Sequence, residues 1–254
     1  MKMALTVAGS DPTGGAGLQA DLRTFKAMGV HGLSVPSVLT AQNTKGVSGI
    51  QEIPSEFFTE QLDTLLEDVR PDALKTGMLY SPEIVSIIAE KMRVYSLRNL
   101  VIDPVTVSST GVLLVQEGTL DAIKNVLFPY ARVITPNIYE ASVLTGLRVE
   151  DENGMKEAAL KLRDHGVETV IITGGHMEKK ALDLFFDGED FLFLENDKLE
   201  AEFHGTGCVF SSVITACLAL DCDPREAFAK AKNFVWNAMK SGVSAGTGMK
   251  ILNF

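Results

Sequence analysis

Residues 4–28, ALTVAGSDPTGGAGLQADLRTFKAM, join a short apolar segment, a glycine-rich turn and an amphipathic segment. The apolar segment Ala4–Ala8 predicts a β-strand that ends at Gly9. Leu18–Met28 predicts a helix, because its apolar residues recur three or four positions apart. A strand, a glycine turn and a helix in this order are typical of proteins whose helices pack on a parallel sheet.

The same alternation continues along the chain. Further strands are predicted at Leu33–Leu39, Ala73–Lys75, Asn99–Ile102, Arg132–Thr135 and Glu168–Thr173. Helices are predicted from Pro54 onward and at Pro82–Val94, Leu120–Leu127, Ile138–Leu144, Gly154–His165, Gly207–Leu220 and Pro224–Ser241. Ala181–Phe186 and Asp190–Leu194 alternate in polarity around Asp187-Gly188, which predicts a hairpin.

This pattern predicts an α/β fold with a mostly parallel central sheet, helices on both faces and a small antiparallel addition at one edge. No linker or repeat interrupts it, so a single domain over residues 1–254 is expected. Pro36 falls inside a predicted strand, where a missing N–H indicates an edge or a bulge.

The composition narrows the choice of partners. The 254 residues include 23 Lys and Arg against 33 Asp and Glu, a net charge of −10, which disfavours nucleic acid as a ligand. No apolar run is long enough to span a membrane, and the apolar run at the N-terminus is too short for a signal peptide. Three clustered cysteines without metal-site spacing indicate reduced thiols, so we expect a cytoplasmic protein.

Ligands of open α/β sheets bind beyond the carboxyl ends of the strands. Glycine or polar residues follow nearly every predicted strand of this chain, which predicts a site built from many loops on one rim. These stretches are Gly9-Ser10-Asp11, Thr40-Ala41-Gln42-Asn43-Thr44, Thr76-Gly77-Met78, Asp103-Pro104-Val105, Thr135-Pro136-Asn137 and Thr173-Gly174-Gly175-His176.

The strongest motif is His204-Gly205-Thr206-Gly207-Cys208, which precedes an apolar helical run. Glycines at a helix start let backbone N–H groups converge, and the helix N-terminus adds positive potential, so this stretch predicts an anion hole for a transferring phosphoryl group. Cys208 would sit at the helix start, where the pKa of a thiol is lowered, and could take a proton from an attacking hydroxyl. The alternative is a plain turn followed by a small buried cysteine.

A second glycine-rich loop, Asp11-Pro12-Thr13-Gly14-Gly15-Ala16-Gly17, joins the first strand to the first helix. It is not a Walker A motif, because no Lys-Ser/Thr pair follows Gly14. The dinucleotide fingerprint is matched only in part, since the acidic residue expected about 20 positions later is missing. A tight turn and a ligand contact stay open for this loop.

Asp103 and Glu140 stand near neighbouring strand ends and together could hold Mg²⁺ directly or through water. Glu140 has the alternative of interacting with the dipole of its own helix. The amides of Gln42-Asn43 could read the edge of a ring, or could simply form a turn. Asp21 falls on a predicted helix and could take part in the site or simply lie on a solvated helix face. Met78 is expected either against an aromatic ring or in the core.

In their order and spacing, these residues resemble the hydroxymethylpyrimidine/phosphomethylpyrimidine kinases of thiamine biosynthesis, in the ribokinase-like superfamily. The resemblance runs from Gly9 to the last helix. Its matching stretches are those given above for the strand ends, without Thr173, together with residues 14–21, 75–79, Glu140-Ala141 and 204–208. It implies a ribokinase-like kinase domain, usually a homodimer, that phosphorylates 4-amino-5-hydroxymethyl-2-methylpyrimidine with ATP and then phosphorylates the monophosphate to the pyrophosphate.

The resemblance also implies a role for each matching residue. Gln42 would hold the pyrimidine edge, with Asp21 near the substrate's polar groups and Gly9, Met78 and Val105 around the ring. ATP would contact Asn137, Thr173 and Gly175. Asp103 and Glu140 would serve Mg²⁺. Gly205, Thr206 and Gly207 would form the anion hole, with Cys208 in the place of the aspartate base of sugar-kinase relatives.

Three departures, the first being Pro36 within its strand, and two alternatives accompany the resemblance. Thr173 stands where the family commonly has a lysine, and Gly246-Thr247-Gly248-Met249 follows the family's ending only in part. The loop Ser108-Ser109-Thr110-Gly111 is a candidate flap. A pyridoxine/pyridoxal kinase is the first alternative, and a non-catalytic pyrimidine-binding module is the second.

Overall fold

The computed structural model describes residues 1–254 except 108–110, 112 and 176–179. In the described part a nine-stranded sheet has the order β3-β2-β1-β4-β5-β6-β7-β8-β9. Its strands are β1 (Met3–Ser10), β2 (His31–Asn43), β3 (Gly46–Glu52), β4 (Ala73–Thr76), β5 (Leu100–Ile102), β6 (Ala131–Ile134), β7 (Thr169–Ile172), β8 (Ala181–Phe186) and β9 (Phe191–Asn196). The six strands from β2 to β7 are parallel, whereas β3, β8 and β9 are antiparallel to their neighbours.

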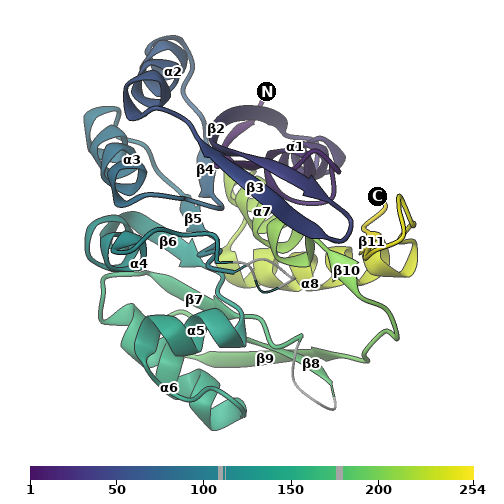
Figure 1. Ribbon diagram of the computed structural model, residues 1–254. Coiled ribbons are helices and arrows are strands. Elements are labelled where there is room, and N and C mark those ends of the chain that lie inside the picture. The colour runs from purple at the N-terminus through teal and green to yellow at the C-terminus, as the bar shows by residue number, and fades with distance from the viewer. Residues whose placement is uncertain (108–110, 112, 176–179) are drawn as a thin grey trace.

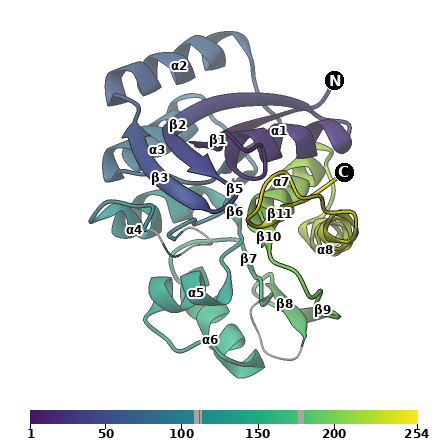
Figure 2. The ribbon, with the colours of Figure 1, turned by 45° about the vertical axis from the view of Figure 1, so that its right-hand side comes forward.

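Helices cover both faces of this sheet (Figures 1 and 2). One face carries α1 (Gly17–Ala27), α7 (Thr206–Ala219) and α8 (Pro224–Lys240). The other carries α2 (Ser55–Asp68), α3 (Pro82–Val94), α4 (Thr119–Ala122) with the π-helical turn η1 (Ile123–Leu127) and the 3-10 turn η2 (Phe128–Tyr130), α5 (Ile138–Thr145) and α6 (Glu152–Arg163). The predicted mostly parallel sheet with helices on both faces and an antiparallel edge hairpin is confirmed.

The strands build two cores because their successive side chains point to opposite faces of the sheet. In β5, Leu100 and Ile102 are buried under α2, α3 and α6, whereas Val101 packs toward α7 and α8. β7 follows the same rule, with Val170 and Ile172 on the first face and Ile171 on the second. These strands are apolar throughout, since they are covered on both sides.

Pro36 lies at a bulge, as its missing N–H predicted. In the pairing of β1 with β2, Ala8 pairs with Pro36 but Gly9 pairs with Val38, so β2 has one extra residue there. The extra residue, Ser37, is buried and donates its hydroxyl to the carbonyl of Met78 at 2.6 Å. The bulge therefore turns a side chain of β2 toward the strand end that carries Met78.

Three short strands were not predicted from the sequence. β3 pairs antiparallel with the end of β2, so β2 continues to Asn43 instead of ending at Leu39. β10 (Phe203–His204) pairs in parallel with β11 (Lys250–Ile251), which brings the C-terminal segment beside the 204–208 motif. The candidate flap residues 108–110 and His176 lie outside the described residues.

No helix in the described part of the chain is both long and apolar enough to span a membrane. The predicted single domain over residues 1–254 stays a prediction.

Candidate active site

A cavity of about 1430 Å³ opens at the carboxyl ends of the parallel strands. It is lined by the loops after these strands, the start of α5 and the start of α7. Twelve of the residues predicted for the site line it: Gly9, Gln42, Met78, Asp103, Val105, Asn137, Glu140, Thr173, Gly205, Thr206, Gly207 and Cys208. The other two predicted site residues, Asp21 and Gly175, are not among the described residues that line the cavity.

The start of α7 faces the cavity with uncapped backbone. Gly205 precedes the helix with a φ of 85°, a left-handed conformation that glycine adopts without strain. No side chain caps this helix end, so its first N–H groups stay available to a ligand. A Cβ on Gly205 would run into the carbonyl of Gly15, which shows how closely the two glycine-rich loops pack. This arrangement is suited to binding an anion.

Cys208 does not have the lowered pKa that its position predicted. Burial raises the pKa of its thiol to about 12, and the charges of Asp103 and Asp21 act in the same direction. The positive charge of Lys75 and a backbone hydrogen bond from Gly17 lower it, but by less. The prediction is therefore wrong, because desolvation outweighs the helix terminus. The side chain is nevertheless only half-buried.

Asp103 and Glu140 form a buried acidic pair at the cavity. Burial raises the pKa of both, to about 8 for Glu140, where the charge of Asp103 adds to the effect of burial. Oδ2 of Asp103 accepts a hydrogen bond from Ser211 Oγ at 3.0 Å. Glu140 closes a capping box with Asn137, so the helix-end alternative raised by the sequence is also realised.

The donor set suits Mg²⁺, which is usually held by one or two carboxylates together with water and substrate phosphates. Within the described residues, no group of three or more His, Cys, Asp or Glu side chains could hold a metal ion. The charge of Asp103 raises the pKa of Glu140, and a divalent cation between the two carboxylates would offset this repulsion.

Asp21 lies beneath the cavity floor and not on a solvated helix face. Its carboxylate is completely buried and accepts hydrogen bonds from Lys75 Nζ at 2.6 Å, Thr6 Oγ1 at 2.6 Å and Ser212 Oγ at 2.7 Å. Placing Asp21 beside the substrate's polar groups is thus not supported by its position. It instead connects α1 to β1, β4 and α7 below the anion hole.

Lys75 is the buried cation of this site, and sequence reasoning gave it no role. Its Nζ lies 3.8 Å from Asp103 Oδ2 as well as 2.6 Å from Asp21 Oδ1. Burial opposes its charge, but Asp21, Cys208 and Asp103 outweigh burial and raise its pKa above the usual range. The available signal was a lysine in the middle of a short strand whose neighbours are all apolar or small.

Gln42 shares a hydrogen-bonded cluster with two residues that sequence reasoning also left without a role. Its Nε2 lies 2.9 Å from Nε2 of His204, which in turn lies 2.8 Å from Oδ2 of Asp11. Asp11 also accepts hydrogen bonds from Thr13 and Ala16, so it holds the first glycine-rich loop in shape. The loop is therefore a tight turn anchored by Asp11, and part of it lines the cavity.

Asn137 and Thr173 pair with each other in an isolated parallel bridge at the ends of β6 and β7. The next residue, Gly174, donates its backbone N–H to Asp183, which forms a buried ion pair with Lys232 at 2.8 Å. Gly175 follows but does not line the cavity. The pair Asp183–Lys232 thus supports the loop after β7 from behind.

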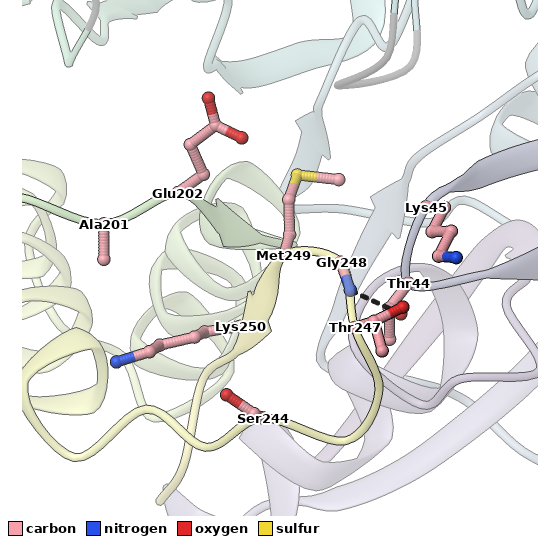
Figure 3. Close-up of a pocket in the computed structure, with 9 residues that line it drawn as sticks. All are labelled: Thr44, Lys45, Ala201, Glu202, Ser244, Thr247, Gly248, Met249 and Lys250. Carbon is pink, nitrogen blue, oxygen red and sulfur yellow. Dashed lines mark hydrogen bonds between the residues drawn. The ribbon is translucent and has the colours of Figure 1, made fainter.

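A second cavity, of about 490 Å³, lies between the β2–β3 turn and the C-terminal segment (Figure 3). Its lining comes from Thr44 and Lys45, from Ala201 and Glu202, and from Ser244 and 247–250. Across it, Gly248 donates its backbone N–H to Thr44 Oγ1 at 3.2 Å. The C-terminal segment therefore ties the turn after Gln42 to β10, which ends at His204.

The site and fold define a kinase of the ribokinase-like class, and comparison with known proteins agrees. The sequence matches the phosphomethylpyrimidine kinase family over residues 11–253. It is 39% identical to the hydroxymethylpyrimidine/phosphomethylpyrimidine kinase of Bacillus subtilis, covering 96% of this chain and 92% of that protein. It is 45% identical to the thiamine biosynthesis bifunctional protein ThiED of Geobacter sulfurreducens, of which it spans 50%.

The structure is similar to that of Bacillus subtilis pyridoxal kinase in complex with ADP, with a TM-score of 0.91 and 35% sequence identity. The match covers 100% of this chain and 97% of that one. The chain belongs to the phosphomethylpyrimidine kinase family. The predicted family and ribokinase-like fold are thereby confirmed.

Proposed function

We propose that this chain phosphorylates 4-amino-5-hydroxymethyl-2-methylpyrimidine with ATP and then phosphorylates the monophosphate to the pyrophosphate, as an enzyme of thiamine biosynthesis. The observation that carries the proposal is the uncapped start of α7 at residues 205–208, which opens into a cavity that also contains Gln42 and the acidic pair. Family membership supports the same substrate class.

In this proposal, the backbone N–H groups of Gly205, Thr206 and Gly207 stabilise the charge of the transferring phosphoryl group. The pyrimidine lies against Gly9, Met78 and Val105, with its polar edge at Gln42. ATP lies along Asn137 and Thr173. Thr173 supplies a hydroxyl where the family commonly has a lysine, so one charged contact to the phosphates is replaced by a neutral one.

Mg²⁺ would be held by Asp103 and Glu140, and when bound it supplies positive charge to the phosphates. The small fraction of Cys208 that is deprotonated accepts the proton of the hydroxymethyl group. Because its thiol is protonated at neutral pH in the structure without ligands, positioning and charge stabilisation by the anion hole carry most of the catalysis.

A pyridoxal kinase is the second candidate, favoured by the structural likeness to such an enzyme. A coupled assay of ADP release with Mg-ATP tests both, with the pyrimidine alcohol and pyridoxine offered in parallel. Preferred turnover of the pyrimidine supports the proposal, and preferred turnover of pyridoxine supports the second candidate. Binding of the pyrimidine without ADP release would indicate the non-catalytic module.

A homodimer, as the resemblance implies, and a cytoplasmic location, as the cysteine usage indicates, also belong to this proposal. Light scattering of the purified chain would check the first, with a mass of twice 27.4 kDa as the expected result.

A further inference from the structure

The side-chain amide of Gln42 makes one contact with His204 and one with Thr40, and in neither contact do donor and acceptor pair correctly. Nε2 of Gln42 lies 2.9 Å from Nε2 of His204, while Oε1 of Gln42 lies 3.1 Å from Oγ1 of Thr40. The two ends of an amide have nearly the same shape, so hydrogen-bond partners decide which end lies where. Both contacts bear on that choice.

The first contact depends on the proton of His204. Oδ2 of Asp11 lies 2.8 Å from His204 Nε2 and also accepts hydrogen bonds from Thr13 Oγ1 at 2.8 Å and Ala16 N at 2.9 Å. Burial opposes ionisation of Asp11, but the bonds from His204 and Thr13 outweigh burial and hold its pKa below the usual range. An ionised carboxylate only accepts, so Nε2 of His204 carries a proton. The single hydrogen on Nε2 is then shared between Asp11 Oδ2 and the atom of Gln42 that faces it, so that atom has to be an acceptor and not an NH₂ group.

The second contact gives the same answer independently. Thr40 Oγ1 lies 2.8 Å from the carbonyl oxygen of Ser10, which can only accept, so the single hydroxyl hydrogen of Thr40 is used there. The atom of Gln42 that faces Thr40 must then be a donor. Both neighbours of the amide thus require Oε1 toward His204 and Nε2 toward Thr40.

We propose that Asp11 and His204 are positioning residues that fix the Gln42 amide in this orientation and thereby set the enzyme's specificity for an aminopyrimidine edge. In this orientation Oε1 keeps one lone pair and Nε2 keeps one hydrogen for the cavity. A substrate edge with an amino group beside a ring nitrogen offers the matching donor and acceptor. All four hydrogen-bonding positions of the amide are then satisfied.

The surrounding segments hold Gln42 and His204 close together. Gln42 precedes the β2–β3 turn and His204 ends β10, two segments about 160 residues apart in sequence. The C-terminal segment joins them, because Met249 N donates to Thr44 O at 3.0 Å and Lys250 N donates to Glu202 O at 3.1 Å (Figure 3). His204 also fills the space beside Gly15, where an added Cβ would lie 2.8 Å from its ring.

The inference rests on the proposed pyrimidine kinase activity, and its test separates the two. The ratio of kcat/KM for the aminopyrimidine alcohol to that for the same alcohol without its amino group is measured in four proteins. These are the wild type, His204→Leu, His204→Gln and His31→Leu, the last being an exposed histidine as control. We expect His204→Leu to lower the ratio about tenfold or more, because Gln42 is then free to turn.

His204→Gln should retain most of the wild-type ratio, since its amide can donate both to Asp11 and to Gln42, and His31→Leu should leave the ratio unchanged. An unchanged ratio in His204→Leu, with all substrates slowed equally, would overturn the relay and leave a structural role. Absence of pyrimidine turnover in the wild type would instead contradict the proposed function.

A second measurement needs no variant and records the ¹⁵N spectrum of the wild-type histidine rings. We expect Nε2 of His204 to carry the hydrogen that Asp11 accepts, and an Nε2 without a hydrogen would overturn the proposal.

Discussion

The ammonium group of Lys75 lies 2.6 Å from the carboxylate of Asp21, and neither side chain has any exposed surface. This ion pair joins β4 to α1 directly below the start of α7. Its second acidic neighbour, Asp103, connects it to the cavity at 3.8 Å. The charged groups that act on the candidate site therefore include a fully buried ion pair below the cavity as well as the side chains that line it.

Replacing Lys75 with Met is expected to destabilise the fold by roughly 3–5 kcal/mol, because Asp21 would be left as an unpaired buried charge. Urea unfolding followed by circular dichroism measures this. Lys180→Met is the matched control, since Lys180 makes an ion pair with Glu195 in which both side chains are more than half exposed. Equal stability of Lys75→Met and the wild type would show that the buried pair is not required.

The thiol of Cys208 gives a prediction about pH. With a folded-state pKa of about 12, its thiolate is scarce at pH 7 and increases about tenfold for each pH unit below that value. If the thiolate accepts the substrate proton, kcat/KM keeps rising between pH 9 and pH 10 in the wild type, above the pKa of about 8 of Glu140, and is flat there in Cys208→Ala.

We also expect Cys208→Ala to lower kcat about 100-fold while KM for the alcohol changes little. Near-normal turnover of this variant would remove Cys208 as the base and leave the anion hole unaffected.

Replacing Gln42 with Ala is expected to raise KM for the pyrimidine alcohol about tenfold and to leave KM for ATP unchanged, because the substrate edge loses its hydrogen bonds. Steady-state kinetics with each substrate varied in turn gives both values. Asn43→Ala, in the next residue and exposed, serves as the control. An unchanged KM for the alcohol in Gln42→Ala would place the pyrimidine elsewhere in the cavity.

Gly205 and Gly207 should differ in their tolerance of a methyl group. Gly205→Ala is expected to lose at least ~1–2 kcal/mol of stability, because its φ of 85° disfavours other residues and the new Cβ would meet the backbone of Gly15. Gly207→Ala should keep wild-type thermal stability, since nothing lies within 4 Å of its added Cβ. Thermal unfolding of both variants measures the difference, and equal Tm values would contradict the close packing of the two loops.

The sequence by itself determined the layers of this protein and most of its site. Strand and helix periodicity follow from local spacing, and parallel strands must end on one rim, so residues as distant as Gln42, Asp103 and Cys208 were expected around one cavity. An edge or a bulge was also predicted at Pro36, because proline lacks the N–H that an uninterrupted ladder uses, and the structure has the bulge.

Only the tertiary structure decided the pKa values of the ionisable groups and which polar side chains pair with one another. The local rule for a helix start predicted a lowered pKa for Cys208, but burial, which depends on elements far apart in sequence, raised it. Asp21 was expected to face solvent or substrate, and its pairing with Lys75 became visible only when α1 was packed on β4. The relay from Asp11 through His204 to Gln42 likewise depends on hydrogen-bond geometry across the chain, which spacing in the sequence does not contain.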